Sequence, residues 1–275
     1  MAVARGFFDD SQSTGRVWAL GGYIGGFHDW NRFEPAWDAV MGRHGVPYFH
    51  MKEMARPNGV YAKWHPPREH RDDLKAFFAD MVAAIHDSGI VGFCSIVRLS
   101  DLEKYNSDFG LNVQPYPLAV YGCMTLLAKY YTYQPIELIY DHVEKIESKL
   151  AVAREYASSD PAHPDVFEHM MNMPLSSKIT WREITALQAA DFFSWEFRRS
   201  HLDINEWFEL PSRPEEEPER WAHFQQWSIE KFGQSIPVFR KSADALLGNP
   251  SWDYLIWDRK NLMEAHELRN GKWPS

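Results

Sequence analysis

Three aspartates stand where a charged side chain needs a physical reason. Asp9 closes a short aromatic segment, Asp141 directly follows the apolar run 136–140, and Asp191 lies on an otherwise apolar helical stretch. An isolated buried charge costs several kcal/mol unless it meets water, a cation or hydrogen-bond donors. If the three carboxylates converge they repel one another, and a divalent cation is the usual remedy. The pattern predicts a site for Mg²⁺ or Mn²⁺.

The chemistry expected of such a site is phosphodiester cleavage. Magnesium is bound through one or two carboxylates plus phosphate oxygens of a substrate, and two ions about 3.5–4 Å apart can activate water and stabilise a leaving alkoxide. In this hypothesis Asp9 bridges two ions, while Asp141 and Asp191 hold one each. Two ordinary alternatives stay open: Asp10 is typical of a turn before Ser11, and Asp141 is a good cap for a following helix.

His50 and Glu53 are the next candidates for catalytic residues. Three residues apart, they lie on one side only if their segment is helical. His50 would orient the scissile phosphate or the attacking water, and Glu53 would be a fourth metal ligand or a general base. The alternative is a hydrogen-bonded histidine and a solvated glutamate, which is the commoner outcome for an isolated polar pair.

A basic loop offers a candidate contact with nucleic acid. Lys63, Arg68 and Arg71 are interleaved with Trp64 and His65, so they could hold phosphates and stack on a base. Such a loop is more often ordinary surface. The 12 histidines include no tight pattern such as His-Glu-x-x-His, so a dedicated zinc site is not expected.

The elements that must position these residues alternate between strands and helices, which predicts an α/β architecture. We expect strands at 5–9, 17–24, 46–51, 90–97 and 136–140, the first two as an antiparallel hairpin. We expect helices at about 31–44, 71–87, 117–131, 149–157 and 183–199. The proline-rich stretch 211–218 is typical of a linker, so residues 1–205 form the predicted core and residues 206–275 a linker and helical, Trp-rich appendage packed on the core or a partner.

Composition excludes several classes of protein. With 275 residues, 45% of them hydrophobic and 15% aromatic, the chain has the means to fold. No apolar run approaches the ~18–20 residues that span a bilayer, and no signal peptide is visible, so we expect a cytoplasmic protein without a membrane partner. The two cysteines lie in apolar segments and predict no disulfide framework. A net charge of −9 means that any nucleic-acid binding must come from a local site.

Taken together, these residues resemble the bacterial domain-of-unknown-function family numbered 3800. The resemblance spans residues 5–200 and is carried by the segments 8–11, 18–24, 49–53, 140–141 and 187–191, with Ser176 and Ser177. That family resembles ribonuclease H-like nucleases, which implies a mixed sheet flanked by helices. It also implies metal ligands from the first strand at Asp9, from the end of the fourth core strand at Asp141, and from a late helix at Asp191. Asp10 stands where the family usually has Glu, which argues against a direct role.

The leading hypothesis is therefore a Mg²⁺- or Mn²⁺-dependent nuclease or phosphodiesterase acting on DNA, RNA or a smaller phosphoester. A rival hypothesis is a non-catalytic binding or regulatory module of the same fold, with its Trp-rich tail docking a protein or a second copy of the chain as a homo-oligomer. A third is a hydrolase with histidine-bound zinc.

Overall fold

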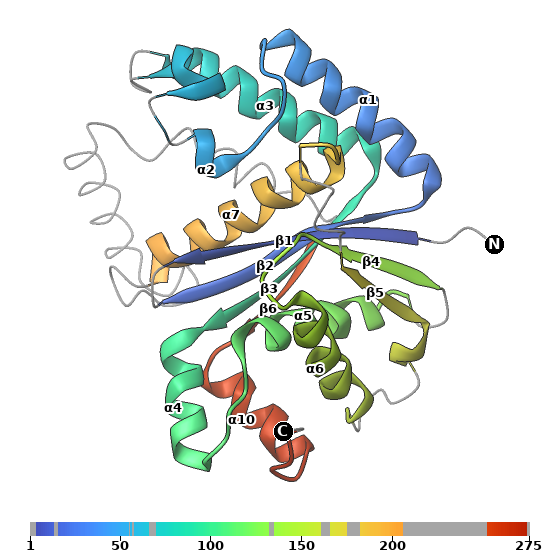
Figure 1. Ribbon diagram of the computed structural model, residues 1–275, viewed down its shortest axis with the longest axis vertical. Coiled ribbons are helices and arrows are strands. Elements are labelled where there is room, and N and C mark those ends of the chain that lie inside the picture. The colour runs from blue at the N-terminus through green and yellow to red at the C-terminus, as the bar shows by residue number, and fades with distance from the viewer. Residues whose placement is uncertain are drawn as a thin grey trace, which may run out of the picture.

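The protein is built on a mixed β-sheet between two layers of helices (Figure 1). The computed structural model describes residues 4–13, 16–54, 56, 58–65, 70–131, 135–160, 166–174, 182–205 and 252–273. The strands are β1 (Ala4–Ser13), β2 (Val17–Gly25), β3 (Val91–Arg98), β4 (Ile136–Tyr140), β5 (Met170–Pro174) and β6 (Trp252–Trp257). They form a six-stranded sheet in the order β5-β4-β1-β2-β3-β6. β2 is antiparallel to β1 and β3, and the other neighbouring strands are parallel.

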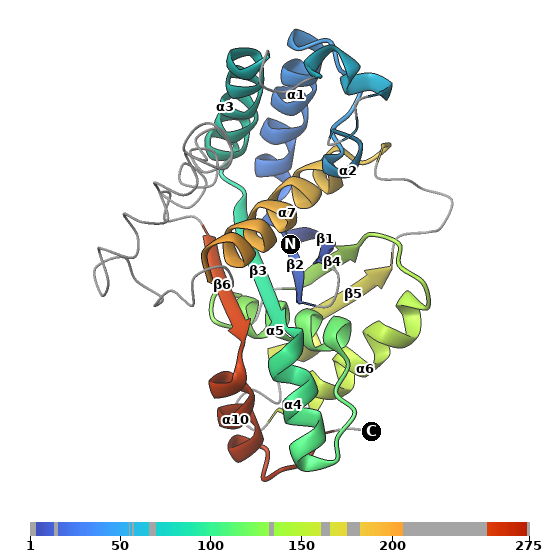
Figure 2. The same cartoon turned by 90° about the vertical axis from the view of Figure 1, so that its left-hand side faces the viewer.

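Each face of the sheet carries its own helical layer and its own buried core, as Figures 1 and 2 both show. One layer contains α1 (Phe27–Arg43), α2 (Met51–Met54), the 3-10 helix η1 (Gly59–Trp64), α3 (Arg71–Ser88) and α7 (Thr185–Asn205). The other contains α4 (Leu99–Phe109), α5 (Pro115–Ala128), α6 (Ile146–Ser158), the 3-10 helix η2 (Val166–His169) and α10 (Arg259–Leu268). We call these the α7 face and the α5 face.

The alternation of side chains along β1 decides which face each acidic residue meets. Successive residues of a strand point to opposite faces. Phe7 packs edge-on against Trp30 of α1, with ring centroids 5.0 Å apart, on the α7 face. Phe8 is fully buried in the core of the α5 face, next to Tyr140. Asp9 therefore shares the α7 face with Phe7, and the next residue of β1 shares the α5 face with Phe8.

Helix α7 crosses β2 in close contact at Gly21. A Cβ placed on Gly21 would lie 3.1 Å from the Cα of Ser194 and 3.1 Å from a ring carbon of Phe193. Because Gly21 pairs with Asp9 across the β1–β2 ladder, this close crossing also brings α7 over the middle of β1. The contact sets the height of α7 above the sheet, and with it the position of Asp191.

Several predicted elements are confirmed. The helix at 71–87 is α3 and ends at Gly89, whose φ of 85° is left-handed. The strand at 136–140 is β4, and the predicted hairpin is β1–β2. Helix α1 starts earlier than expected because the carboxylate of Asp29 accepts the Gly26 N–H at 2.8 Å, and Pro35 lies within the helix. Helix α4 was not predicted, because it buries only Leu102 and Tyr105.

Two predictions about the chain were wrong. Residues 46–50 form no strand, and α2 follows them. The tail is not a purely helical appendage, because β6 adds to the sheet beside β3 and α10 follows it. Trp257 is buried and its indole donates to Ser95 Oγ at 3.2 Å, so this tryptophan serves the fold. The predicted linker at 211–218 lies outside the described residues. Of the helices described, none is long and apolar enough to cross a membrane.

Candidate active site

The three aspartates come from three elements that meet beside the middle of β1, where β4 ends. Asp9 lies on β1 and faces α7. Asp141 directly follows β4, and its backbone N–H donates to the carbonyl of Phe8 at 2.9 Å, so it extends the β4–β1 ladder by one residue. Asp191 lies on α7, above β1. All three residues are neither fully buried nor fully exposed. We call these three residues the aspartate cluster.

The electrostatics of the cluster show that its members act on one another. Burial raises the pKa of Asp9 well above its ordinary value, and repulsion by Asp191, Asp141 and Asp10 raises it further. Burial raises the pKa of Asp191 to about 7, although the hydrogen bond from Met51 works in the opposite direction. Burial also raises the pKa of Asp141. Burial and mutual repulsion therefore both disfavour the ionised form of these carboxylates.

Few of the described residues compensate this charge. Asp9 Oδ1 accepts the N–H of Asp10 at 2.8 Å, and Asp141 Oδ1 accepts the N–H of His142 at 2.7 Å. Asp191 feels a favourable but more distant charge from Arg198. Among the described residues, no Lys, Arg or His lies within ion-pair distance of a cluster carboxylate. These neighbours are too few to explain three carboxylates at one place.

The carboxylates of the cluster suit Mg²⁺ or Mn²⁺ only if water and substrate oxygens complete the coordination shell. Within the described ranges, no three His, Cys, Asp or Glu side chains are arranged as a ligand set for one ion. A cage made wholly of these side chains is therefore not formed there. Magnesium, however, is commonly held by one or two carboxylates, with water and substrate phosphate oxygens completing its shell. The carboxylate oxygens of the cluster suit that second manner of binding.

Asp10 does not belong to the cluster, nor does it lie in a turn. The strand continues to Ser13, and Asp10 pairs with Leu20 in the β1–β2 ladder, which corrects the expected turn at this position. Its side chain faces α5 and α6, where Gln12 Nε2 donates to Asp10 Oδ2 at 3.2 Å and Lys149 contributes a favourable charge. The carboxylate of Asp10 therefore lies on the α5 face.

His50 and Glu53 lie on one side of the chain, as a helical segment requires, with His50 Nδ1 3.7 Å from Glu53 Oε1. Both oxygens of Glu53 have donors: Tyr48 Oη at 2.7 Å from Oε2 and Arg182 Nη2 at 2.9 Å from Oε1. Burial acts to raise the pKa of Glu53, but these two hydrogen bonds bring it below its ordinary value. Burial lowers the pKa of His50, which favours a neutral imidazole at neutral pH. Their catalytic roles remain predictions.

A network that the sequence did not reveal fixes residues 48–51 against the cluster. Asp191 Oδ2 accepts the N–H of Met51 at 2.7 Å, and Gln188 Oε1 accepts the N–H of Phe49 at 2.8 Å. The hydroxyl of Tyr61 accepts the N–H of His50 at 2.9 Å and donates to a carbonyl of the same segment. These side chains satisfy the backbone groups that a strand would have paired with a neighbour. The signal was the three-residue spacing of Gln188 and Asp191, which puts them on one side of α7.

The basic loop does not offer the stacking surface that its sequence suggested. Trp64 is buried and packs against Phe77, with ring centroids 4.8 Å apart. Lys63 Nζ donates to the carbonyls of His44 and Gly45. Arg68 lies outside the described residues. The interpretation of this loop as a base-stacking contact is therefore wrong for Trp64.

Comparisons of this chain with protein-family models, with curated proteins and with solved structures found no match. The chemistry of the site must therefore be inferred from its own residues. Its defining feature is a partly exposed group of mutually repelling carboxylates at the junction of β1, β4 and α7.

Proposed function

We propose that the protein is a Mg²⁺- or Mn²⁺-dependent hydrolase of phosphodiesters, with the aspartate cluster as its metal-binding centre. The observation that carries this proposal is the mutual repulsion of Asp9, Asp141 and Asp191 at a partly exposed junction of three elements. Strongly raised carboxylate pKa values at an accessible site are commonly found where a ligand supplies the missing charge. A divalent cation supplies it with the oxygen ligands that it prefers.

The placement of the residues agrees with what the resemblance to ribonuclease H-like nucleases implies. Asp9 lies on the first strand, Asp141 at the end of the fourth, and Asp191 on the helix α7, which follows β5. The sheet is mixed and flanked by helices. This agreement supports the choice of phosphodiester hydrolysis over other reactions that use a divalent cation.

Each residue of the site would have a distinct task. Asp9, Asp141 and Asp191 would hold the cations, which polarise the phosphate and lower the pKa of water when bound. The N–H of Met51 keeps one Asp191 oxygen in place and leaves the other for a ligand. His50 is favoured in its neutral form, so its imidazole could accept the proton of the attacking water. Glu53 would act only after release from Arg182 and Tyr48.

The test is hydrolysis of single-stranded, duplex and hybrid substrates with Mn²⁺ by Asp9→Asn and Asp191→Asn. Each substitution keeps the size of the side chain and removes a charge, and we expect each to reduce the rate at least 100-fold. Asp73→Asn on α3, whose carboxylate is well exposed, is the matched control and should keep the rate of the parent protein. Hydrolysis that survives both cluster substitutions would overturn the proposal.

A second candidate function, a non-catalytic binding module of the same fold, is favoured by one specific observation. Both oxygens of Glu53 are engaged by Tyr48 and Arg182, so a fourth carboxylate is not poised at the cluster. Calorimetric titration separates the two functions. Binding of Mn²⁺ that Asp9→Asn abolishes supports the hydrolase, whereas absence of binding at millimolar Mn²⁺ supports the module.

A further inference from the structure

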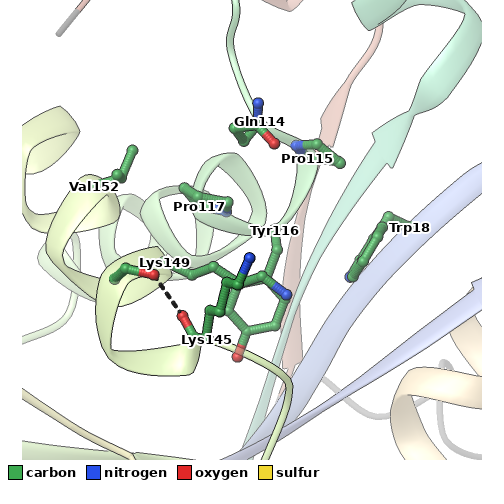
Figure 3. A pocket seen from close by; sticks show the side chains of 9 residues that line it. Trp18, Gln114, Pro115, Tyr116, Pro117, Lys145, Lys149 and Val152 are labelled. Carbon is green, nitrogen blue, oxygen red and sulfur yellow. Dashed lines mark hydrogen bonds between the residues drawn. The ribbon is translucent and has the colours of Figure 1, made fainter. Parts of the chain in front are cut away.

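A cavity of about 390 Å³ opens on the α5 face, between β2, α5 and the start of α6 (Figure 3). Its volume lies within the roughly 300–1,000 Å³ of sites that take small ligands. The polar and aromatic part of its lining consists of Trp18, Gln114, Tyr116, Lys145, Ser148 and Lys149. Figure 3 shows Tyr116 between the two lysines on one side and Trp18 on the other. None of these residues belongs to the aspartate cluster.

The two lysines make this cavity a place of positive charge in an acidic protein. Lys145 is the N-cap of α6 and Lys149 lies one turn further on, so both stand at the positive end of the helix dipole. Within the described residues, neither has a carboxylate at ion-pair distance. Lys149 Nζ instead lies 5.2 Å from the ring centroid of Tyr116. Lysines that have no carboxylate at ion-pair distance and lie beside a helix N-terminus suit a phosphate group.

The aromatic side of the cavity suits the base of a nucleotide. Trp18 is partly exposed, and its ring stands edge-on to that of Tyr116 with centroids 6.0 Å apart. The indole N–H of Trp18 is shielded from water and has no acceptor among the described residues. Aromatic side chains next to lysines are the usual means of holding single-stranded nucleic acid.

The charges of the aspartate cluster act on a residue that lines the cavity. Asp10, Asp9 and Asp141 all act on the hydroxyl of Tyr116, and Lys149 acts on the carboxylate of Asp10. The chain itself joins the two sites, because α6 begins only a few residues after Asp141. The two sites lie on opposite faces of the sheet, so a polymer that reached both would have to pass beyond the end of β4, where β1 continues without that partner.

We propose that this cavity holds a nucleotide of single-stranded nucleic acid next to the bond that the cluster cleaves, an inference that rests on the proposed function. Lys145 and Lys149 bind a phosphate of that nucleotide, and Trp18 contacts its base over the floor formed by Tyr116. The substrate is accordingly a nucleic-acid strand and not a small phosphoester. An unpaired base is required, because the cavity contacts the face that stacking in a duplex would cover.

The test compares Lys145→Ala/Lys149→Ala with Lys75→Ala/Lys260→Ala, which removes the same charge from exposed positions on α3 and α10. Affinity for fluorescently labelled single-stranded DNA and RNA of one sequence is measured by anisotropy in an Asp191→Asn background, at several NaCl concentrations. We expect the cavity pair to weaken binding at least 10-fold. The slope of log affinity against log salt should fall by about 0.7, since the two lysines bind one phosphate and each neutralised phosphate on a single strand contributes about 0.7. The control pair should bind like its parent.

A second measurement separates this inference from the proposed function. Hydrolysis of bis(p-nitrophenyl) phosphate with Mn²⁺ reports on the cluster alone, and the control pair Lys75→Ala/Lys260→Ala with an intact Asp191 should keep the parent rate. If the cavity pair binds both strands with unchanged affinity and salt slope, the inference is overturned, whereas hydrolysis of the small ester leaves the proposed function standing. If the cavity pair weakens strand binding but the parent protein hydrolyses neither substrate, the proposed function fails and the binding site stands.

Discussion

Replacing Asp191 by Asn should stabilise the metal-free protein above neutral pH. The folded protein raises the pKa of Asp191 to about 7 from an ordinary 3.8, chiefly by burial. Ionisation of this side chain is therefore less favourable in the folded state than in the unfolded state, and it lowers the stability of the fold. Asparagine carries no charge, and its side-chain oxygen can still accept the hydrogen bond from Met51 that Asp191 accepts at 2.7 Å.

The sign and size of the effect follow from proton linkage. Below pH 3.8 the carboxyl is protonated in both the folded and the unfolded state, so the stability of the fold is not reduced by its ionisation. Between pH 3.8 and about 7 the unfolded chain releases the proton while the folded chain keeps it, so stability falls as the pH rises. Above that window the loss is constant at about 4 kcal/mol, because each pH unit of pKa difference corresponds to about 1.4 kcal/mol. At ~2 °C per kcal/mol for a chain of this size, the variant should melt ~8 °C higher than the parent.

Thermal unfolding followed by circular dichroism between pH 4 and 8.5 in EDTA provides the measurement. The melting temperatures of the two proteins should be similar near pH 4 and diverge as the pH rises through about 7, with Asp191→Asn the more stable. Addition of Mn²⁺ should raise the melting temperature of the parent far more than that of the variant, since a ligand stabilises the state that binds it. The exposed Asp73→Asn substitution should show neither effect.

The opposite outcome is an Asp191→Asn variant that is less stable than the parent at pH 8 in EDTA. That outcome would mean that the Asp191 charge is compensated in the folded state, contrary to the repulsion that Asp9 and Asp191 exert on each other. A difference in melting temperature that does not change with pH would be equally damaging, because a mere packing effect has no reason to follow the titration of a carboxylate.

Three further predictions concern the same site. Protons compete with metal for carboxylates whose pKa is raised, so the Mn²⁺ concentration for half-maximal hydrolysis should increase as the pH is lowered from 8 to 6, and activity titrations will show it. Gln188→Leu leaves the N–H groups of Phe49 and Trp37 without their buried acceptor, so urea unfolding should show a loss of about 2–4 kcal/mol. Gly21→Ala places a Cβ 3.1 Å from the Cα of Ser194, so α7 must shift by a few tenths of an ångström relative to β2, and calorimetry should show weaker Mn²⁺ binding at a largely preserved far-UV spectrum.

The parts of the fold that sequence predicts well are those in which the signal is local. The apolar stripe of residues 71–87 and the left-handed Gly89 define α3 without help from other elements. The apolar run of β4 is bounded by Pro135 and Asp141 and has the length of an internal strand. In both cases the conformation is determined by residues within the element itself.

The segment 46–50 shows why the rest could not be predicted. Its composition is compatible with a strand, but its backbone N–H groups find acceptors on α7 and η1. The Met51 N–H is bonded to a carboxylate 140 positions along the chain. Strand β6 presents the same difficulty, since its only partner in the sheet among the described residues is β3, far away in sequence. Such choices are made by tertiary contacts and leave no local pattern.

The same limit applies to the candidate site. The three aspartates could be found because each is anomalous in its own segment, as a charge at the end or on the apolar side of an element. The cavity could not, because Trp18, Tyr116 and the lysines of α6 belong to different elements and none is unusual where it stands. Period-two alternation did contain one usable signal: Asp9 and Asp10 had to face opposite sides of the sheet once β1 was known to continue past them.

That alternation explains how an acidic protein could act on a polyanion. Asp9 directs its charge to the α7 face, where the cluster requires cations, and Asp10 directs its charge to the α5 face, where Lys149 lies within its electrostatic reach. A strand that crosses β1 where β4 ends would meet cations on one side and lysines on the other, so its phosphates would be compensated on both. Because the whole chain carries a net charge of −9, most of its surface repels the strand, and this crossing is where binding would be favoured. Without metal the cluster adds to the repulsion, so binding of the strand and binding of the cation should strengthen each other.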